Sequence, residues 1–217
     1  MGFRHFDLCY AYGGGIANAT FREALSGNDE VLVSSKIGLD PRLVFQDSTA
    51  VYYAKRFLNR RRLLIPTDDV FPDLEHRLSR EKRTLGRHLI DYLFLHEPYD
   101  RFMADPVLPE WVASGGFGSF QKFGIAGPRN AIEPWLKFVK RSSIPVITQT
   151  KDSLEQREAD FLEQYGRLRE FTYGYFGATK VERGTQETLA SALNINHAGK
   201  VLYSTLSCDR LEQLRLG

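Results

Sequence analysis

The sequence has few of the residues that mark secreted, membrane-spanning or metal-binding proteins. It holds 2 cysteines in 217 residues, too few for a disulfide framework, which favours a reducing cytoplasm. These cysteines and the 5 histidines never fall at metal-ligand spacing, so we expect no metal site. No apolar run approaches the roughly 18 residues that span a bilayer, and Arg4, His5 and Asp7 interrupt any N-terminal signal segment. We therefore expect a cytoplasmic protein with neither membrane nor metal as a partner.

An excess of charge of one sign is also missing. The chain carries 29 basic and 27 acidic residues, a net charge of +2, which gives no electrostatic reason for nucleic acid or an anionic membrane as a partner. No serine or cysteine is framed by a base, so the sequence does not indicate covalent hydrolysis. What is present is ordinary for a soluble globular protein, with 42% hydrophobic and 26% charged residues. The length allows one substantial domain, 1–217.

Short β-branched or aromatic segments alternate with helical patterns along the chain. Such alternation predicts an α/β fold in which a parallel sheet is covered by helices. The sequence predicts seven strands, one fewer than the eight-stranded (β/α)8 TIM barrel. Residues 39–72 break the rhythm and are predicted to be an insertion with one helix. For Arg60–Arg62 in this segment, a solvated helix end is preferred over an anion site. The predicted strands are 4–8, 30–35, 91–95, 120–125, 146–149, 170–175 and 200–204.

Helices are predicted at 73–86, 130–142 and 184–196. In the first, leucines recur at helical spacing at positions 74, 78 and 85 and define the buried face. Its polar side chains are predicted to face water, namely Arg77, Arg80, Glu81 and Lys82. The second begins with Asn130, which is predicted to cap it, and ends in basic residues.

Polar side chains follow the apolar strands in chain order: Asp7 with Tyr12, then Lys36, His96 and Gln149. Each alone is ordinary, as a polar strand end, a structural histidine or a helix-capping acid. In a barrel of parallel strands, however, all strand ends meet at one rim, where active sites lie. Their recurrence on successive strands therefore indicates one shared site.

This combination of side chains suits proton transfer. A tyrosine has a pKa near 10, and a neighbouring lysine ammonium stabilises the phenolate and lowers that pKa. An aspartate behind the lysine keeps it charged, and a histidine can direct a substrate oxygen toward the phenol. The sequence thus indicates a proton donor for a carbonyl that is being reduced.

Several segments resemble the signatures of the aldo-keto reductase superfamily. "GFRHFDLCYAYGGG" resembles its second barrel strand, "VLVSSKIG" its third-strand lysine segment, and "LSREKRTLGRHLIDYLFLHEP" its helix and fourth strand with the active-site histidine. The similarity continues through "KFGIAG", "IPVITQTKDSL", "FTYGYFG" and "VLYSTLSCDRLEQL". The resemblance implies a (β/α)8 barrel that transfers a hydride from NADPH, with NADH as the alternative, to an aldehyde or ketone. It maps the family's catalytic tetrad onto Asp7, Tyr12, Lys36 and His96.

The same resemblance implies a cofactor site. Gln149 matches the position that binds the nicotinamide amide, and Tyr173 matches the aromatic residue that stacks on its ring. Where the family often has Ser-Asn as further amide ligands, this chain has Ala126 and Gly127, which removes those side-chain contacts. The turn after the last strand, where the adenosine phosphate would lie, offers Ser204, Thr205, Ser207 and Arg210.

The first signature comes so early that we expect the chain to lack the family's first strand and helix, with 39–72 inserted after the third strand of the full barrel. Three explanations stay open: a misassigned start or truncated gene, a fragment, or a shortened barrel. Unpaired strand edges at the gap would invite self-association.

Two other functions are weighed against a carbonyl reductase. One is a non-catalytic relative that senses a nucleotide or serves as an interaction subunit. The other, a barrel isomerase acting on phosphorylated sugars, is disfavoured by the tetrad. The substrate itself is not specified by the sequence, because 39–72 and the C-terminal part resemble the family least. Tyr52, Tyr53 and Trp111 are pocket candidates for which packing is the preferred interpretation.

Overall fold

The alternating strands and helices of the sequence form a parallel sheet covered by helices in the computed structural model. The structure describes residues 3–25, 27–38, 70–97, 105–142, 144–176, 184–205 and 207–214. The strands pair in the order β1 to β7, every neighbouring pair being parallel. Each strand overlaps its predicted range, so all seven strand predictions are confirmed. The strands are β1 (His5–Asp7), β2 (Leu32–Ile37), β3 (Ile90–His96), β4 (Phe120–Gly127), β5 (Ile147–Lys151), β6 (Phe171–Tyr173) and β7 (Lys200–Leu202).

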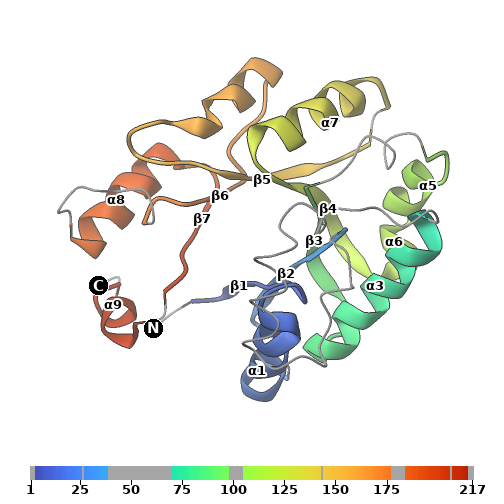
Figure 1. Ribbon diagram of the computed structural model, residues 1–217, viewed down its shortest axis with the longest axis horizontal. Coiled ribbons are helices and arrows are strands. Elements are labelled where there is room, and N and C mark those ends of the chain that lie inside the picture. Colours follow the sequence, from blue (N-terminus) through green and yellow to red (C-terminus); the bar gives the residue numbers. More distant parts are fainter. Residues whose placement is uncertain are drawn as a thin grey trace, which may run out of the picture.

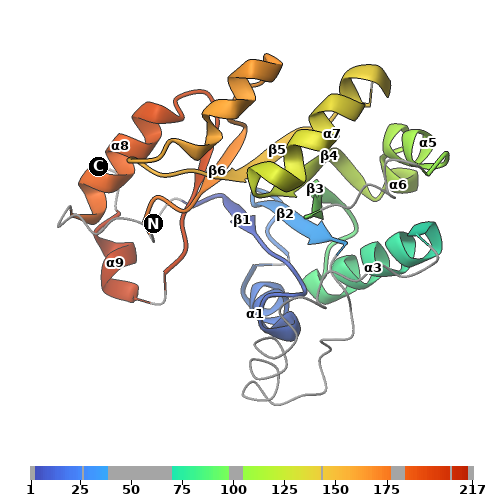
Figure 2. The same ribbon diagram turned by 45° about the horizontal axis from the view of Figure 1, so that its top comes forward.

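The sheet curls into an almost closed barrel with helices around its outside (Figures 1 and 2). No pairing joins β7 to β1 among the described residues. The prediction of a seven-stranded relative of the eight-stranded barrel is therefore confirmed. The helices are η1 (Gly13–Gly15), α1 (Ile16–Leu25), α3 (Val70–Leu85), α5 (Leu108–Ala113), α6 (Gly115–Gly118), α7 (Arg129–Ser142), η2 (Glu158–Tyr165), α8 (Thr185–Ile195) and α9 (Cys208–Glu212).

The three predicted helices correspond to α3, α7 and α8. Helix α7 begins one residue before the predicted cap, because the carbonyl of Pro128 already accepts the amides of Ala131 and Ile132. Of the predicted insertion, 70–72 begins α3, whereas 39–69 lies outside the described residues, as do Tyr52, Tyr53 and Arg60–Arg62. None of the described helices is long and apolar enough to cross a bilayer.

Apolar side chains fill two separate spaces. The larger cluster lies between the sheet and the helices, and includes the buried residues Val33, Leu93 and Ile125 on strands and Leu74 and Trp135 on helices. The smaller one groups alternate residues of the strands, Phe94, Ala126 and Phe171, with Tyr92, Ile147 and Leu202 packed against them. Because successive strand side chains point to opposite faces, this second cluster fills the barrel interior. Trp111 belongs to the outer core and is fully buried, as its packing interpretation predicted.

Helix α3 corrects one prediction. Its leucines are buried as expected, but Arg77 is only 3% exposed and Glu81 only 1%. The prediction that these two face water was therefore wrong. The helix lies against both β2 and α1, so its buried face is wider than a single leucine stripe. Helical periodicity identifies the leucine stripe, but it does not show that a second element also covers the helix.

The floor of the barrel holds His5, a half-buried residue whose two ring nitrogens are buried. The His5 ring stacks on Tyr92, with ring centroids 5.1 Å apart, and meets Phe171 edge-on at 5.3 Å. Neither ring nitrogen has a hydrogen-bond partner among the residues that the structure describes. Burial, followed by repulsion from Lys200, lowers the pKa of His5 from 6.5 to about 4.

We expect acid to destabilise the fold through this residue. A folded-state pKa below the unfolded value means that the stability is present above pH 6.5 and is lost as the pH falls toward 4. The loss between about pH 7.5 and about pH 4 is about 3 kcal/mol, the pKa difference times about 1.4 kcal/mol. Urea unfolding at both pH values measures it. His5→Phe should lower this pH dependence by the same amount, and an unchanged dependence would contradict the assignment.

Candidate active site

Polar side chains from four strands meet at the carboxyl-terminal rim of the barrel. Asp7 ends β1, His96 ends β3, Lys36 lies next to the end of β2, and Gln149 lies in β5. The strand register aligns Asp7 with Ser34 and His96 with Ala126, and Ala126 in turn with Gln149. Since all the strands run in the same direction, these side chains enter the barrel at one level. The structure thus brings together the residues that the sequence placed at a common rim.

Asp7 is the centre of the hydrogen-bond network at this rim. Its Oδ2 accepts from Lys36 Nζ at 2.5 Å and from Gln149 Nε2 at 3.1 Å, and its Oδ1 accepts from Ser34 Oγ at 2.6 Å. The Lys36 side chain is 3% exposed. Burial alone would lower the pKa of Lys36, but attraction to Asp7 and then Tyr12 outweighs burial and raises that pKa. The lysine is therefore held as a charged ammonium.

Tyr12 lies in the loop after β1, where its amide bonds the carbonyl of Cys9 at 2.8 Å. Lys36 Nζ lies 5.1 Å from the Tyr12 ring centroid. The rings of Tyr12 and His96 meet edge-on with centroids 6.4 Å apart. The four predicted catalytic side chains, Asp7, Tyr12, Lys36 and His96, therefore converge.

The pKa of Tyr12 differs from the sequence expectation. Burial raises it to about 12, although the charge of Lys36 and hydrogen bonding by Lys36 both lower it. The predicted effect of the lysine is present, but burial is larger, and Asp7 also offsets part of the lysine charge. At neutral pH the phenol is protonated, which is the form that can donate a proton.

Two residues of the rim were missed by sequence reasoning. Ser34 holds the second oxygen of Asp7 and shares the inward face of β2 with Lys36, a pattern that alternation along "VSSK" could have indicated. Glu97 follows β3 with a φ of +48° and donates its amide to the carbonyl of Ala126 at 2.6 Å. Burial raises the pKa of Glu97, and burial followed by Glu97 raises that of Tyr173. A second carboxyl group thus lies near the site.

The residues predicted for the nicotinamide fit a carboxamide ligand. Gln149 is 2% exposed, and its Oε1 has no hydrogen-bond partner among the described residues. An unpaired buried acceptor is costly in the absence of a ligand, and an amide N–H₂ group would satisfy it. Tyr173, the last residue of β6, is half-buried and lies in the electrostatic range of Lys36 and Asp7. The amide and aromatic partners predicted for the nicotinamide are therefore both at the rim.

The remaining predicted cofactor residues form the turn between β7 and α9. Ser207 caps α9 by accepting the amide of Arg210, and Thr205 Oγ1 accepts the amide of Ser207 at 3.1 Å. Ser204 and Arg210 have exposed side chains. These hydrogen bonds are local and leave the assignment of this turn to a phosphate as a prediction. No three His, Cys, Asp or Glu side chains of the described ranges could hold a metal ion together.

Comparison of the sequence with models of known families and with curated proteins finds no match. Solved structures do resemble it. A Pseudomonas aeruginosa protein assigned to the aldo-keto reductases shares 14% identity at a TM-score of 0.65, with 97% of this chain and 74% of that chain covered. An aldo/keto reductase from Brucella melitensis shares 14% at 0.62, covering 98% and 77%. The holo form of aldo-keto reductase AKR11C1 from Bacillus halodurans shares 16% at 0.61, covering 97% and 74%. The chain therefore has the barrel fold of the aldo-keto reductases, as its sequence motifs predicted.

Proposed function

We propose that the protein is an oxidoreductase of the aldo-keto reductase type that reduces an aldehyde or ketone to an alcohol with NADPH. The observation that carries the proposal is the convergence of Asp7, Tyr12, Lys36 and His96 at one rim of a barrel with that fold. Lys36 is held as a charged ammonium and Tyr12 as a protonated phenol, as their proposed roles require. Active sites of such barrels lie at this rim.

The proposed chemistry is proton donation by Tyr12. When bound, the nicotinamide supplies a hydride to the carbonyl carbon. The Tyr12 hydroxyl gives its proton to the substrate oxygen as negative charge grows there, and Lys36 stabilises the phenolate that remains. Asp7 keeps Lys36 charged and oriented through the 2.5 Å contact. His96 directs the substrate oxygen toward the phenol.

The proposed cofactor ligands are Gln149 for the amide and Tyr173 for the nicotinamide ring. The turn that contains Ser204, Thr205, Ser207 and Arg210 would hold the adenosine phosphate. We propose NADPH rather than NADH because the guanidinium of Arg210 can pair with an extra phosphate.

Both cysteines are free thiols, which supports the proposed cytoplasmic location.

A non-catalytic nucleotide-sensing or interaction subunit is the second candidate. Two observations favour it: Ala126 and Gly127 offer no side-chain donor to the nicotinamide amide, and the edges of β1 and β7 are not paired with each other in the described part of the chain. Self-association through these edges is part of that proposal. Sedimentation of the purified protein tests it, because edge pairing would make its mass depend on concentration.

Cofactor binding and turnover separate the two candidates. We expect NADPH to quench the fluorescence of the purified protein with saturation, and a reactive aldehyde to cause NADPH oxidation under the same conditions. Binding without oxidation for a panel of aldehydes and ketones would favour the sensing role. A calorimetric titration with no heat for either NADPH or NADH would contradict the reductase and favour the non-catalytic interaction subunit.

A further inference from the structure

Glu81 is a buried carboxylate outside the proposed catalytic site, and both of its oxygens are fully engaged. It lies on α3, is 1% exposed, and accepts the amide of Tyr10 on Oε1 at 2.9 Å. Its Oε2 accepts from Asn18 Nδ2 at 2.9 Å and from Ser35 Oγ at 2.8 Å. One side chain therefore joins the loop after β1, helix α1 and strand β2.

The partners of Glu81 lie beside the proposed catalytic residues. Tyr10 precedes Tyr12 by two residues in the same loop, and Ser35 directly precedes Lys36 on β2. Alternation along β2 turns Ser35 outward to α3 while Lys36 enters the barrel. Glu81 thus holds the loop backbone that carries Tyr12. From the outer face of the sheet it also holds β2, the strand that carries Lys36.

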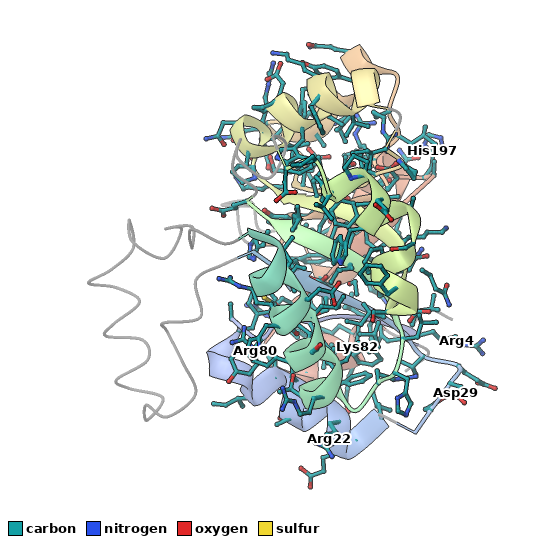
Figure 3. All side chains as sticks on the ribbon, turned by 90° about the vertical axis from the view of Figure 1, so that its right-hand side faces the viewer. Arg4, Arg22, Asp29, Arg80, Lys82 and His197 are labelled. Atoms are coloured by element: carbon teal, nitrogen blue, oxygen red, sulfur yellow. The ribbon has the colours of Figure 1, made fainter. Side chains whose placement is uncertain are left out.

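The surroundings of the network fix its geometry. Asn18 is fully buried and also donates to Thr84 Oγ1 at 3.0 Å, one turn after Glu81. The Arg80 guanidinium lies over the Tyr10 ring, 4.1 Å from its centroid. Arg80 and Lys82 on α3, and Arg22 on the adjacent α1, are labelled in Figure 3. The loop is therefore clamped through both its backbone amide and its aromatic side chain.

Burying the carboxyl group of Glu81 costs desolvation free energy, which an apolar side chain at this position would not cost. Burial raises the pKa of Glu81, although hydrogen bonds from Ser35, Asn18 and the Tyr10 amide lower it. A buried carboxylate must be fully hydrogen-bonded to be tolerated, and apolar residues of similar size are often at least as stable. A carboxylate here is explained by the groups that it holds in place.

We propose that Glu81 is a positioning residue that sets the distance between Tyr12 and Lys36 by anchoring the Tyr10 amide and Ser35; this inference rests on the proposed reductase function. A rigid loop places the phenol where it can donate, and small displacements of a reacting group cost rate rather than cofactor affinity. Glu81 itself touches neither substrate nor cofactor.

Glu81→Leu and Glu81→Gln test the proposal, with Leu85→Ala as the matched control. Leu removes every acceptor, whereas Gln keeps an oxygen for the Tyr10 amide but places N–H groups opposite Asn18. Leu85 is a buried residue one turn further along α3 and is not part of the network. The measurements are kcat at saturating NADPH and aldehyde, the NADPH dissociation constant, the unfolding temperature, and hydrogen exchange of the amides in 8–15.

We expect Glu81→Leu to lower kcat roughly 10- to 100-fold, with NADPH affinity within about twofold of wild type and faster exchange in 8–15. Glu81→Gln should lose less kcat. Leu85→Ala should lower the unfolding temperature but leave kcat and the exchange of 8–15 unchanged. A wild-type kcat in Glu81→Leu, or a kcat loss in Leu85→Ala equal to that in Glu81→Leu, would overturn the proposal. If the wild-type protein shows no turnover, the reductase function fails, and the exchange data alone decide whether Glu81 anchors the loop.

Discussion

Tyr12→Phe is expected to lower kcat by about 10²–10⁴-fold, the usual contribution of a positioned proton donor. The substitution removes one hydroxyl and keeps the ring, which meets His96 edge-on and lies beside Lys36. Because burial holds the phenol protonated, with a pKa of about 12, this hydroxyl is the donor at neutral pH. Steady-state NADPH oxidation with a reactive aldehyde measures the loss.

Binding and stability should remain when turnover is lost. The cofactor ligands proposed here, Gln149 and Tyr173, are separate from the phenol, so NADPH affinity should stay within about twofold, and the unfolding free energy within about 1 kcal/mol. Tyr165→Phe is the matched control, because it removes a tyrosine hydroxyl that donates to Glu133 at 2.7 Å on the outer side of the barrel. Unchanged turnover in Tyr12→Phe would refute the mechanism, because the proposed proton donor would then be dispensable.

Much of the fold and the rim could be predicted from the sequence because both depend on local patterns. Short apolar segments predict the strands, and parallel strands bring their carboxyl ends to one rim. Asp7, Lys36 and His96 could therefore be placed together without knowledge of any long-range contact. Tyr12, in the loop after the first strand, was placed with them on the same grounds, and the resemblance to aldo-keto reductases suggested the cofactor roles. These roles for Gln149, Tyr173 and the last turn stay predictions.

The missed features depend on contacts between elements distant in sequence. Glu81 was expected to face water because it lies beside the leucine stripe of its helix, and nothing in "SREKRT" reveals the loop and the strand that cover it. The pKa of Tyr12 was expected to follow its lysine, whereas the degree of burial decides it. The 3-10 helix η2 begins at Glu158, after Arg157 in a left-handed conformation, and was not predicted. Local sequence patterns predict helices and strands, but they do not show which distant elements pack against them.

Lys36→Met is expected to destabilise the protein by about 3 kcal/mol and to remove the proposed reductase activity. The substitution leaves the Asp7 carboxylate, 16% exposed, without its cation, and removing one partner of a buried ion pair typically costs about 3–5 kcal/mol. Asp7 still accepts hydrogen bonds from Ser34 and Gln149. The expected loss of unfolding free energy therefore lies at the lower end of that range. Urea unfolding at neutral pH measures it.

The double variant Lys36→Met with Asp7→Asn separates stability from chemistry. A neutral amide at position 7 no longer needs a cation and can still accept from Ser34. Once the Gln149 amide, whose Nε2 now faces position 7, turns over, the new amide can also donate to the Gln149 Oε1, which has no partner in the described structure. The double variant should therefore recover at least about half of the lost free energy but none of the turnover, because the ammonium that stabilises the phenolate stays absent. Recovery of activity together with stability would show that the pair only supports the fold. A double variant as unstable as Lys36→Met would show that the unpaired carboxylate is not the source of the cost.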